Sequence, residues 1–270
     1  MKEAVSRPVP GNPISSSEPD GLLLVGHGTR DSKGTAQFFQ LADVLASRLA
    51  PLPVEGCLLE FQHPTIPEAW QTLVSRGCKQ IRVAPLLLFA AGHARQDIPE
   101  AVAECAAATP EIQYSQSGPL SRSPTLVDLL SRRVEQSLRR SARIDTTDSV
   151  ALVAVGRGSY DPCARADMLV LGEILARRTG LTQHAVGFYA MAEPRLPEVL
   201  DQAAQEPGID VVIVQPHLLF QGRLYDAIER QVAEAGERHP RVRFIVGDYL
   251  GPVPEVADAL AHRALVPALA

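Results

Sequence analysis

The chain has 270 residues, of which 46% are hydrophobic, and a formal net charge of −5 at pH 7. This length is enough for one large domain or two modest ones with buried cores. The negative charge excludes a general electrostatic attraction to nucleic acid or to an acidic membrane surface, so any basic pocket has to be local. The apolar runs are shorter than the roughly 20 residues of a membrane helix. We therefore expect neither a nucleic-acid nor a membrane partner.

The cysteines and the first residues indicate a reduced, cytoplasmic protein. Cys57, Cys78, Cys105 and Cys163 show no Cys-x-x-Cys spacing, which favours buried or free thiols over disulfides or a zinc cluster. Residues 1–20 are rich in Pro, Ser and Gly and lack the apolar stretch of a signal peptide. We expect them to form a flexible tail.

Strand and helix patterns alternate from residue 21 onward. Leucines and Phe38 at helical spacing predict the first helix, and Thr65-Ile66-Pro67-Glu68 is typical of a helix start. The nearly unbroken apolar run 81–89 is typical of a strand buried on both faces of a parallel sheet. The predicted elements are strands over 21–25, 54–61, 81–89 and 112–115 and helices over 34–49, 65–76, 98–108 and 124–139.

The pattern then starts again. Residues 141–149 are polar and predict a linker, and beyond it Val155–Asp161 aligns with Val25–Asp31 at an offset of 130 residues. The offset shifts by one residue near Pro85 and Pro216. The same offset relates Pro64, Pro67, Glu68, Gly92, Leu120, Pro124, Asp128 and Leu130 to Pro194, Pro197, Glu198, Gly222, Leu250, Pro254, Asp258 and Leu260. We infer an internal duplication.

The duplication predicts an α/β fold with two tandem halves. Each half is expected to be a small parallel sheet flanked by helices, with residues 21–140 in the first half, 141–149 as the linker and 150–270 in the second half. A ligand is expected in the cleft between the halves. Because the two halves are fused, a monomer is compatible with the sequence, which leaves the oligomeric state open.

Three candidate metal ligands lie at the ends of successive strands in the first half. His27 follows the first strand between two glycines, Glu60 ends the second and His93 follows the third. Parallel strands bring all three to one edge of the sheet, where open α/β sheets bind ligands. Two imidazoles and a carboxylate suit divalent iron, cobalt, nickel or zinc. We expect the glycines beside His27 to let a substrate or metal ion approach the imidazole.

The second half supplies an internal comparison for these residues. Arg157, Ala190 and Arg223 stand where the first half has its three candidate ligands. The scaffold positions are retained while the candidate ligands are lost together, and arginine replaces two of them. This indicates one half that handles metal or protons and one half that binds carboxylates.

Two motifs carry a resemblance to a known family. Gly26-His27-Gly28-Thr29-Arg30, the strand at 85–89 and then Gly92-His93-Ala94-Arg95-Gln96-Asp97-Ile98-Pro99 resemble the sirohydrochlorin cobaltochelatase and ferrochelatase family of class II chelatases. The second half resembles the degenerate repeat of the family's long form. The resemblance implies two chelatase-like halves, the catalytic histidines His27 and His93, and no organic cofactor. The assignment of Glu60 as a third metal ligand rests on its place at a strand end and not on a motif.

The resemblance implies ATP-independent insertion of Co²⁺ or Fe²⁺, with Ni²⁺ as a further candidate, into sirohydrochlorin for cobalamin or sirohaem synthesis. Insertion removes two pyrrole protons and replaces the water on the metal ion. Histidine suits both tasks because its pKa is about 6.5. The carboxylates of this tetrapyrrole require local positive charge, for which Arg157 and Arg223 are the hypothesis and Arg30 and Arg95 are further candidates.

Alternative functions remain at this point. A protein that carries metal or tetrapyrrole without turnover fits the same residues. A histidine phosphatase would need an arginine before the histidine, where Gly26 stands, and a dinucleotide fingerprint would need glycine where Asp31 stands. Among the other histidines, we expect His217 to be a strand-end residue with its hydrogen bonds satisfied.

Overall fold

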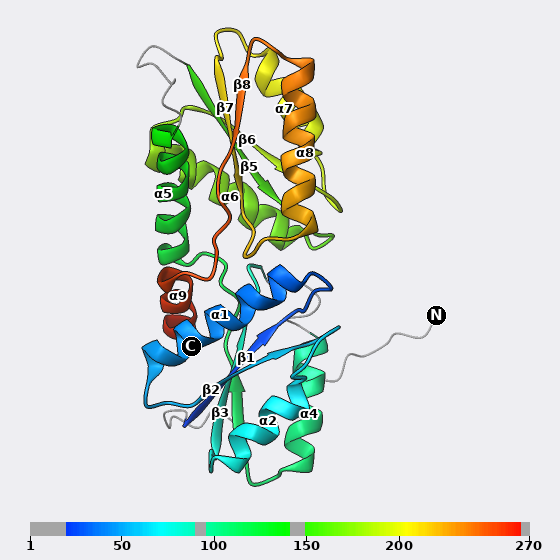
Figure 1. The fold of residues 1–270 in the computed structure, drawn as a ribbon, viewed down its shortest axis with the longest axis vertical. Coiled ribbons are helices and arrows are strands. Elements are labelled where there is room, and N and C mark those ends of the chain that lie inside the picture. The colour runs from blue at the N-terminus through cyan, green and yellow to red at the C-terminus, as the bar shows by residue number, and fades with distance from the viewer. Residues whose placement is uncertain (1–19, 90–95, 141–148, 266–270) are drawn as a thin grey trace, which may run out of the picture.

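The computed structural model describes residues 20–89, 96–140 and 149–265, and within these ranges the chain forms two four-stranded parallel sheets. Figure 1 shows the two sheets one above the other along the long axis. The first sheet has the order β2-β1-β3-β4 and the second β6-β5-β7-β8. The strands are β1 Gly21–Gly26, β2 Val54–Leu58, β3 Gln80–Pro85, β4 Gln113–Gln116, β5 Val150–Gly156, β6 Gln183–Phe188, β7 Val211–Pro216 and β8 Arg243–Val246.

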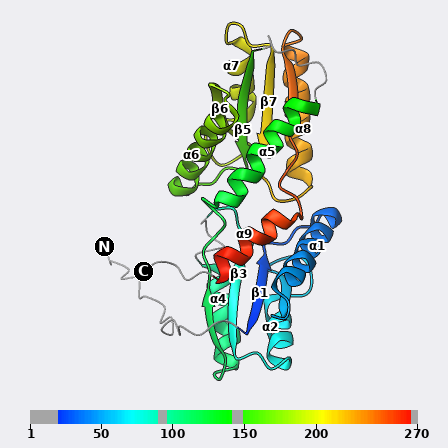
Figure 2. The ribbon, with the colours of Figure 1, turned by 90° about the vertical axis from the view of Figure 1, so that its left-hand side faces the viewer.

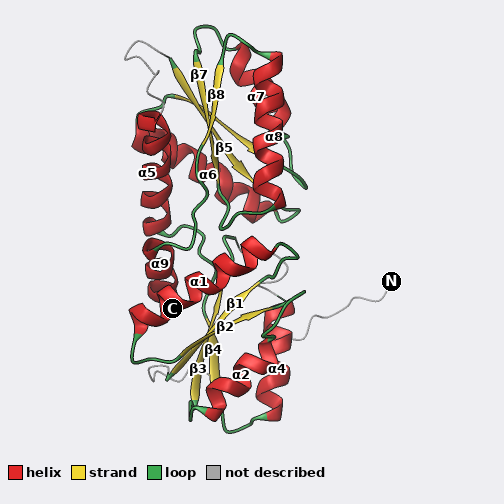
Figure 3. Ribbon diagram, viewed as in Figure 1, coloured by secondary structure: helices red, strands yellow, loops and turns green. Residues whose placement is uncertain are grey.

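Helices cover both faces of each sheet, which confirms the predicted α/β fold with two similar halves (Figure 3). The predicted tail and linker, except for Asp20 and Ser149 nearest the strands, lie outside the described residues. The helices are α1 Ser32–Leu49, α2 Ile66–Ser75, α4 Asp97–Ala108, α5 Pro124–Arg140, α6 Pro162–Thr179, α7 Leu196–Gln205, α8 Arg223–Arg238 and α9 Pro254–Leu265. None of the helices within the described ranges is long and apolar enough to cross a membrane.

One central strand of each sheet, β1 in the first and β7 in the second, is buried along its length. All six residues of β1 are buried, and Leu22 to Val25 have no exposed surface. Burial of an apolar strand on both faces is the arrangement that helices on both sides of a parallel sheet produce. The strand order places the carboxyl ends of β1 and β3 side by side, and likewise those of β5 and β7.

Two strands are shorter than the sequence predicts. β2 ends at Leu58 instead of residue 61, and β3 ends at Pro85 instead of residue 89. Both strands pair with β1, which ends at Gly26, opposite Leu58. Beyond that point neither strand continues its ladder with β1, although the apolar sequence continues. Glu60 therefore lies in the turn after β2 and not at the strand end.

The first helix of each half begins at an aspartate cap. Asp31 accepts hydrogen bonds from the backbone N–H groups of Lys33 and Gly34 at 2.9 and 3.2 Å, and its counterpart Asp161 accepts one from Cys163 at 2.8 Å. Such caps satisfy backbone donors at the start of a helix. The helix α1 consequently begins at Ser32, two residues earlier than predicted.

The last helix of each half is exchanged. Helix α5 packs against β7 of the second sheet and against the neighbouring helix α6. Helix α9 packs against β3 of the first sheet and against the neighbouring helix α1. Figure 2 shows α9 beside the lower sheet and α5 beside the upper one. The predicted halves, 21–140 and 150–270, are thus each completed by a helix from the other.

Candidate functional site

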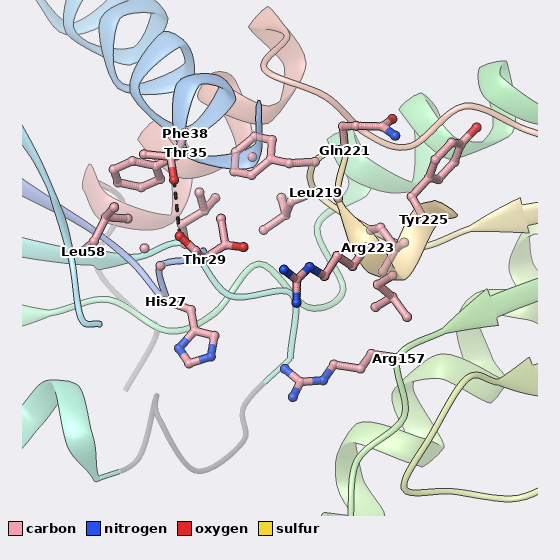
Figure 4. A pocket seen from close by; sticks show the side chains of 18 of the residues that line it. His27, Thr29, Thr35, Phe38, Leu58, Arg157, Leu219, Gln221, Arg223 and Tyr225 are labelled. Atoms are coloured by element: carbon pink, nitrogen blue, oxygen red, sulfur yellow. Dashed lines mark hydrogen bonds between the residues drawn. The ribbon is translucent and has the colours of Figure 1, made fainter. Parts of the chain in front are cut away.

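A cavity of about 670 Å³ lies between the two halves (Figure 4). The first half contributes the loop after β1 and the start of α1 to its walls. The second half contributes the loops after β5, β6 and β7. The cavity therefore lies at the carboxyl ends of the parallel strands, where open α/β sheets bind ligands.

His27 lines this cavity directly after β1. Its side chain is half-buried, and its backbone carbonyl accepts a hydrogen bond from the N–H of Glu60 at 3.1 Å. Leu59 donates in the same way to the carbonyl of Gly26 at 2.9 Å. These two bonds fix the loop after β1 against the turn after β2, so the position of His27 is set by backbone contacts.

The glycines around His27 are needed for packing in both halves. Gly28 has φ +93°, and a Cβ there would collide with the carbonyl oxygen of Glu60. Its counterpart Gly158 has φ +89° and faces the carbonyl of Ala190 in the same way. A Cβ at Gly26 would lie 2.6 Å from the ring of Phe38. Because Gly158 serves the same packing where no histidine is present, the glycine pattern is explained by the loop itself rather than by substrate access.

The other two candidate ligands are placed differently from His27. The Glu60 side chain is exposed and is not among the described residues that line the cavity. His93 lies outside the described residues. Within the described ranges, no three His, Cys, Asp or Glu side chains gather where they could hold a metal ion. A shared ligand set of His27, Glu60 and His93 stays a prediction.

Two arginines of the second half lie across the cavity from His27. Arg157 follows β5 and Arg223 begins α8, and both line the cavity with exposed side chains. Figure 4 shows their guanidinium groups extending toward the side on which His27 lies. Among the described residues, neither takes part in an ion pair.

The remaining arginine candidates do not join this group. The guanidinium carbon of Arg30 lies 5.0 Å from the centre of the Phe61 ring, and Arg30 is not among the described lining residues. Arg95 lies outside the described residues.

Comparison with known proteins identifies the family. The CbiX family model matches the chain twice, over residues 21–137 and 151–265. The chain belongs to the CbiX family. The two matches also confirm the predicted internal duplication.

Named relatives of this CbiX-family chain are sirohydrochlorin chelatases. It is 27% identical to a sirohydrochlorin cobaltochelatase of Priestia megaterium, over 90% of the chain and 78% of the relative. It is 28% identical to a sirohydrochlorin ferrochelatase of the same organism, over 90% and 89%. The solved structure of SirB from Bacillus subtilis with Fe³⁺ superimposes with a TM-score of 0.80 at 28% identity, covering 90% of this chain and 93% of SirB.

A glutamine that sequence reasoning missed connects the two sides of the CbiX-family cavity. Gln37 on α1 accepts a hydrogen bond from the backbone N–H of Gln221 at 2.8 Å and donates one to the hydroxyl of Tyr249 at 2.8 Å. Gln221 lines the cavity beside Arg223. No signal in the sequence marks Gln37, because its partners lie more than 180 residues away along the chain.

The other histidines of this CbiX-family chain differ in their pairing. His63, His184 and His239 lie within 3.0 Å of the carboxylates of Glu68, Glu173 and Asp201. His217 is buried and its Nδ1 atom has no hydrogen-bond partner, so the prediction of a satisfied histidine is wrong. Burial lowers the pKa of His217 to about 4 and keeps its imidazole neutral.

Proposed function

We propose that this protein inserts a divalent metal ion, Co²⁺ or Fe²⁺, into sirohydrochlorin, and that the cavity between the halves holds the macrocycle. The observation that carries the proposal is the placement of His27 on one side of this cavity and of Arg157 and Arg223 on the other. The site thus combines a group that binds metal and accepts protons with two groups that bind carboxylates. The names of the relatives support the same reaction.

The cavity suits a flat, partly apolar ligand. A volume of about 670 Å³ lies within the range of small-molecule sites, about 300–1,000 Å³. Phe38, Leu58, Leu218 and Phe220 supply apolar surface for the rings of a macrocycle. Carboxylate groups around the edge of that macrocycle would meet the guanidinium groups, and Arg is well suited to bind them through paired hydrogen bonds.

In the proposed mechanism, His27 acts on the metal ion and on the pyrrole protons. The metal ion loses bound water as it forms bonds to the macrocycle nitrogens, and two pyrrole N–H protons leave. A neutral imidazole at the cavity wall binds the incoming ion, or accepts one of these protons, near neutral pH. His93 and Glu60 are the proposed further ligands. Imidazole and carboxylate groups both bind iron, cobalt and nickel. The metal that is inserted therefore depends on metal availability as well as on the site.

The same chain supplies both sides of the proposed site. His27 comes from the first half and the two arginines come from the second, so a monomer is sufficient for activity. Cys57, Cys78 and Cys105 are buried free thiols and Cys163 is an exposed one. Free thiols are typical of the reduced cytoplasm, where we place the reaction.

A metal-insertion assay tests the proposal. Purified protein is mixed with sirohydrochlorin and either Co²⁺ or Fe²⁺, with oxygen excluded, and the absorbance change of the macrocycle is followed against a sample without protein. We expect a rate above the spontaneous reaction with at least one of the metals. A rate equal to the spontaneous one with both metals would reject the proposal.

A further inference from the structure

A second cavity, of about 440 Å³, lies between the start of α5, the middle of α6 and the end of β7. Most of its lining is apolar and includes Leu126, Leu130, Leu171 and Ile174. It is distinct from the cavity that contains His27: of the residues described at the two sites, none lines both. The exchanged helix α5 forms one of its walls.

His217 is a buried polar side chain in this second cavity. It follows β7 and is only 7% exposed, and its Nδ1 atom is buried without a hydrogen-bond partner. Its ring centre lies 5.1 Å from that of Phe89, which lines the same cavity from the first half. A buried polar atom without a hydrogen-bond partner destabilises the folded protein. A ligand that forms a hydrogen bond with this atom would remove that cost.

The first half shows that the scaffold does not require a histidine here. Leu86 donates its backbone N–H to Val25, and His217 donates its own to Val155, each at 2.8 Å, so the two residues hold corresponding positions. Leu86 is buried in the apolar core. The imidazole is therefore a feature of the second cavity and not of the strand end.

The charges around the second cavity cancel in pairs. Arg122 lies 2.7 Å from the carboxylate of Asp167, and Arg178 pairs with Asp128. Among the described lining residues, such pairs leave no unbalanced charge to attract a carboxylate, a phosphate or a metal ion. An apolar wall with one neutral hydrogen-bonding ring instead favours an uncharged aromatic ligand.

We propose that the second cavity binds a small neutral aromatic molecule with one hydroxyl or ring N–H group. Its ring packs against Phe89 and the aliphatic wall, and its polar group forms a hydrogen bond with His217. Leu218, the next residue along the chain, lines the first cavity, so an occupant lies against the same loop from the other side.

Phenol is a suitable probe because it has an aromatic ring and one hydroxyl group. Titration of the purified protein with phenol is expected to raise its melting temperature saturably and to shift the imidazole signals of His217 in a nitrogen-detected NMR spectrum. His217→Leu introduces the residue that the first half has at this position, so it is expected to fold and to bind phenol at least tenfold more weakly. No saturable binding, or equal binding by wild type and His217→Leu, would overturn the proposal.

A second variant and a competition experiment complete the test. Val170 on α6 lines the cavity and is 50% exposed, so Val170→Phe is expected to fold, to fill part of the cavity and to weaken phenol binding while His217 stays in place. Unchanged phenol affinity in that variant would count against this cavity as the site. Sirohydrochlorin is expected not to displace phenol. Displacement would show that the cavity belongs to the tetrapyrrole site, and would also contradict the proposal.

Discussion

Arg48 on α1 pairs with Asp258 on α9 at 3.0 Å, although the two residues come from different halves of the sequence. The residues at the corresponding positions of the repeat, Arg178 on α6 and Asp128 on α5, pair as well. Both pairs are exposed and contribute little to stability by themselves. The two ion pairs reflect the duplication. Each half of the chain receives its last helix from the other half, and an equivalent ion pair forms at both of these contacts.

The exchange predicts which sheet each helix stabilises. Leu130 on α5 and Leu260 on α9 are repeat counterparts and are both buried. Leu→Ala at such positions costs about 2–5 kcal/mol. We expect Leu260→Ala to increase amide hydrogen exchange mainly in β1, β3 and α1, and Leu130→Ala to increase it mainly in β5, β7 and α6. Faster hydrogen exchange in the other sheet, the one formed by the same half of the sequence as the substituted helix, would contradict the exchange of helices.

The loop around His27 predicts a stability difference between two glycines. Gly28 and Gly77 have φ of +93° and +89°, but a Cβ on Gly77 would meet nothing within 4 Å, whereas one on Gly28 would strike the Glu60 carbonyl. Both alanine variants incur the strain of a left-handed residue. We expect Gly28→Ala to lower the free energy of unfolding by about 1–3 kcal/mol more than Gly77→Ala, because overpacking adds to that strain. Equal losses of unfolding free energy for the two variants, measured by urea denaturation, would show that the loop shifts to avoid the collision at Gly28.

The two arginines across the cavity predict an effect on substrate binding. We expect Arg157→Ala and Arg223→Ala each to raise the KM for sirohydrochlorin about threefold to tenfold, with a smaller change in kcat, because each removes a contact with a carboxylate that persists through the reaction. Arg30→Ala is the matched control, since Arg30 lies over Phe61 and is not among the described lining residues. An unchanged KM in both cavity variants would remove the arginines from the binding site.

His217 predicts how stability changes with pH. Burial lowers its pKa in the folded protein to about 4, below the ordinary value of 6.5. The unfolded chain therefore binds more protons between these values, and the stability from the neutral ring, full above pH 6.5, is lost as the pH falls toward 4. The loss is about 3 kcal/mol over this range. The other charged residues in the described lining of this cavity are Arg122, Asp167 and Arg178.

His217→Leu isolates this contribution. Denaturation of wild type and of the variant at pH 7, 6 and 5 is expected to show a smaller fall for the variant. Parallel curves for the two proteins would mean that His217 titrates in the folded state as it does in the unfolded chain.

Much of this arrangement was predictable from local pattern. The apolar run before Gly26 indicated β1 and placed His27 just beyond it. The 130-residue offset indicated the second half and placed Arg157 at the position that corresponds to His27. The ends of β2 and β3 were not predictable in this way, because their apolar sequences continue after β1 stops supplying hydrogen-bond partners. This is why Glu60 was expected at a strand end.

The exchange of helices and the environment of His217 were also beyond local pattern. The apolar face of α5 or α9 shows that the helix is buried on one side, but either sheet offers a similar surface because the two are copies. For His217, the strand-end position was predictable, whereas the lack of a hydrogen-bond partner depends on α5, α6 and the first half meeting around it.

His27 is proposed to support repeated metal insertion rather than storage of one cargo molecule. The direct measurement uses sirohydrochlorin and Co²⁺ or Fe²⁺ in fiftyfold excess over the protein and counts metallated product per protein molecule for wild type, His27→Ala and the control His184→Ala. We predict many products per molecule for wild type and the control, and a rate for His27→Ala lower by about 100-fold or more, as for the loss of a general base. Wild-type product that stops at one per molecule, or a His27→Ala rate equal to wild type, would contradict this role of His27.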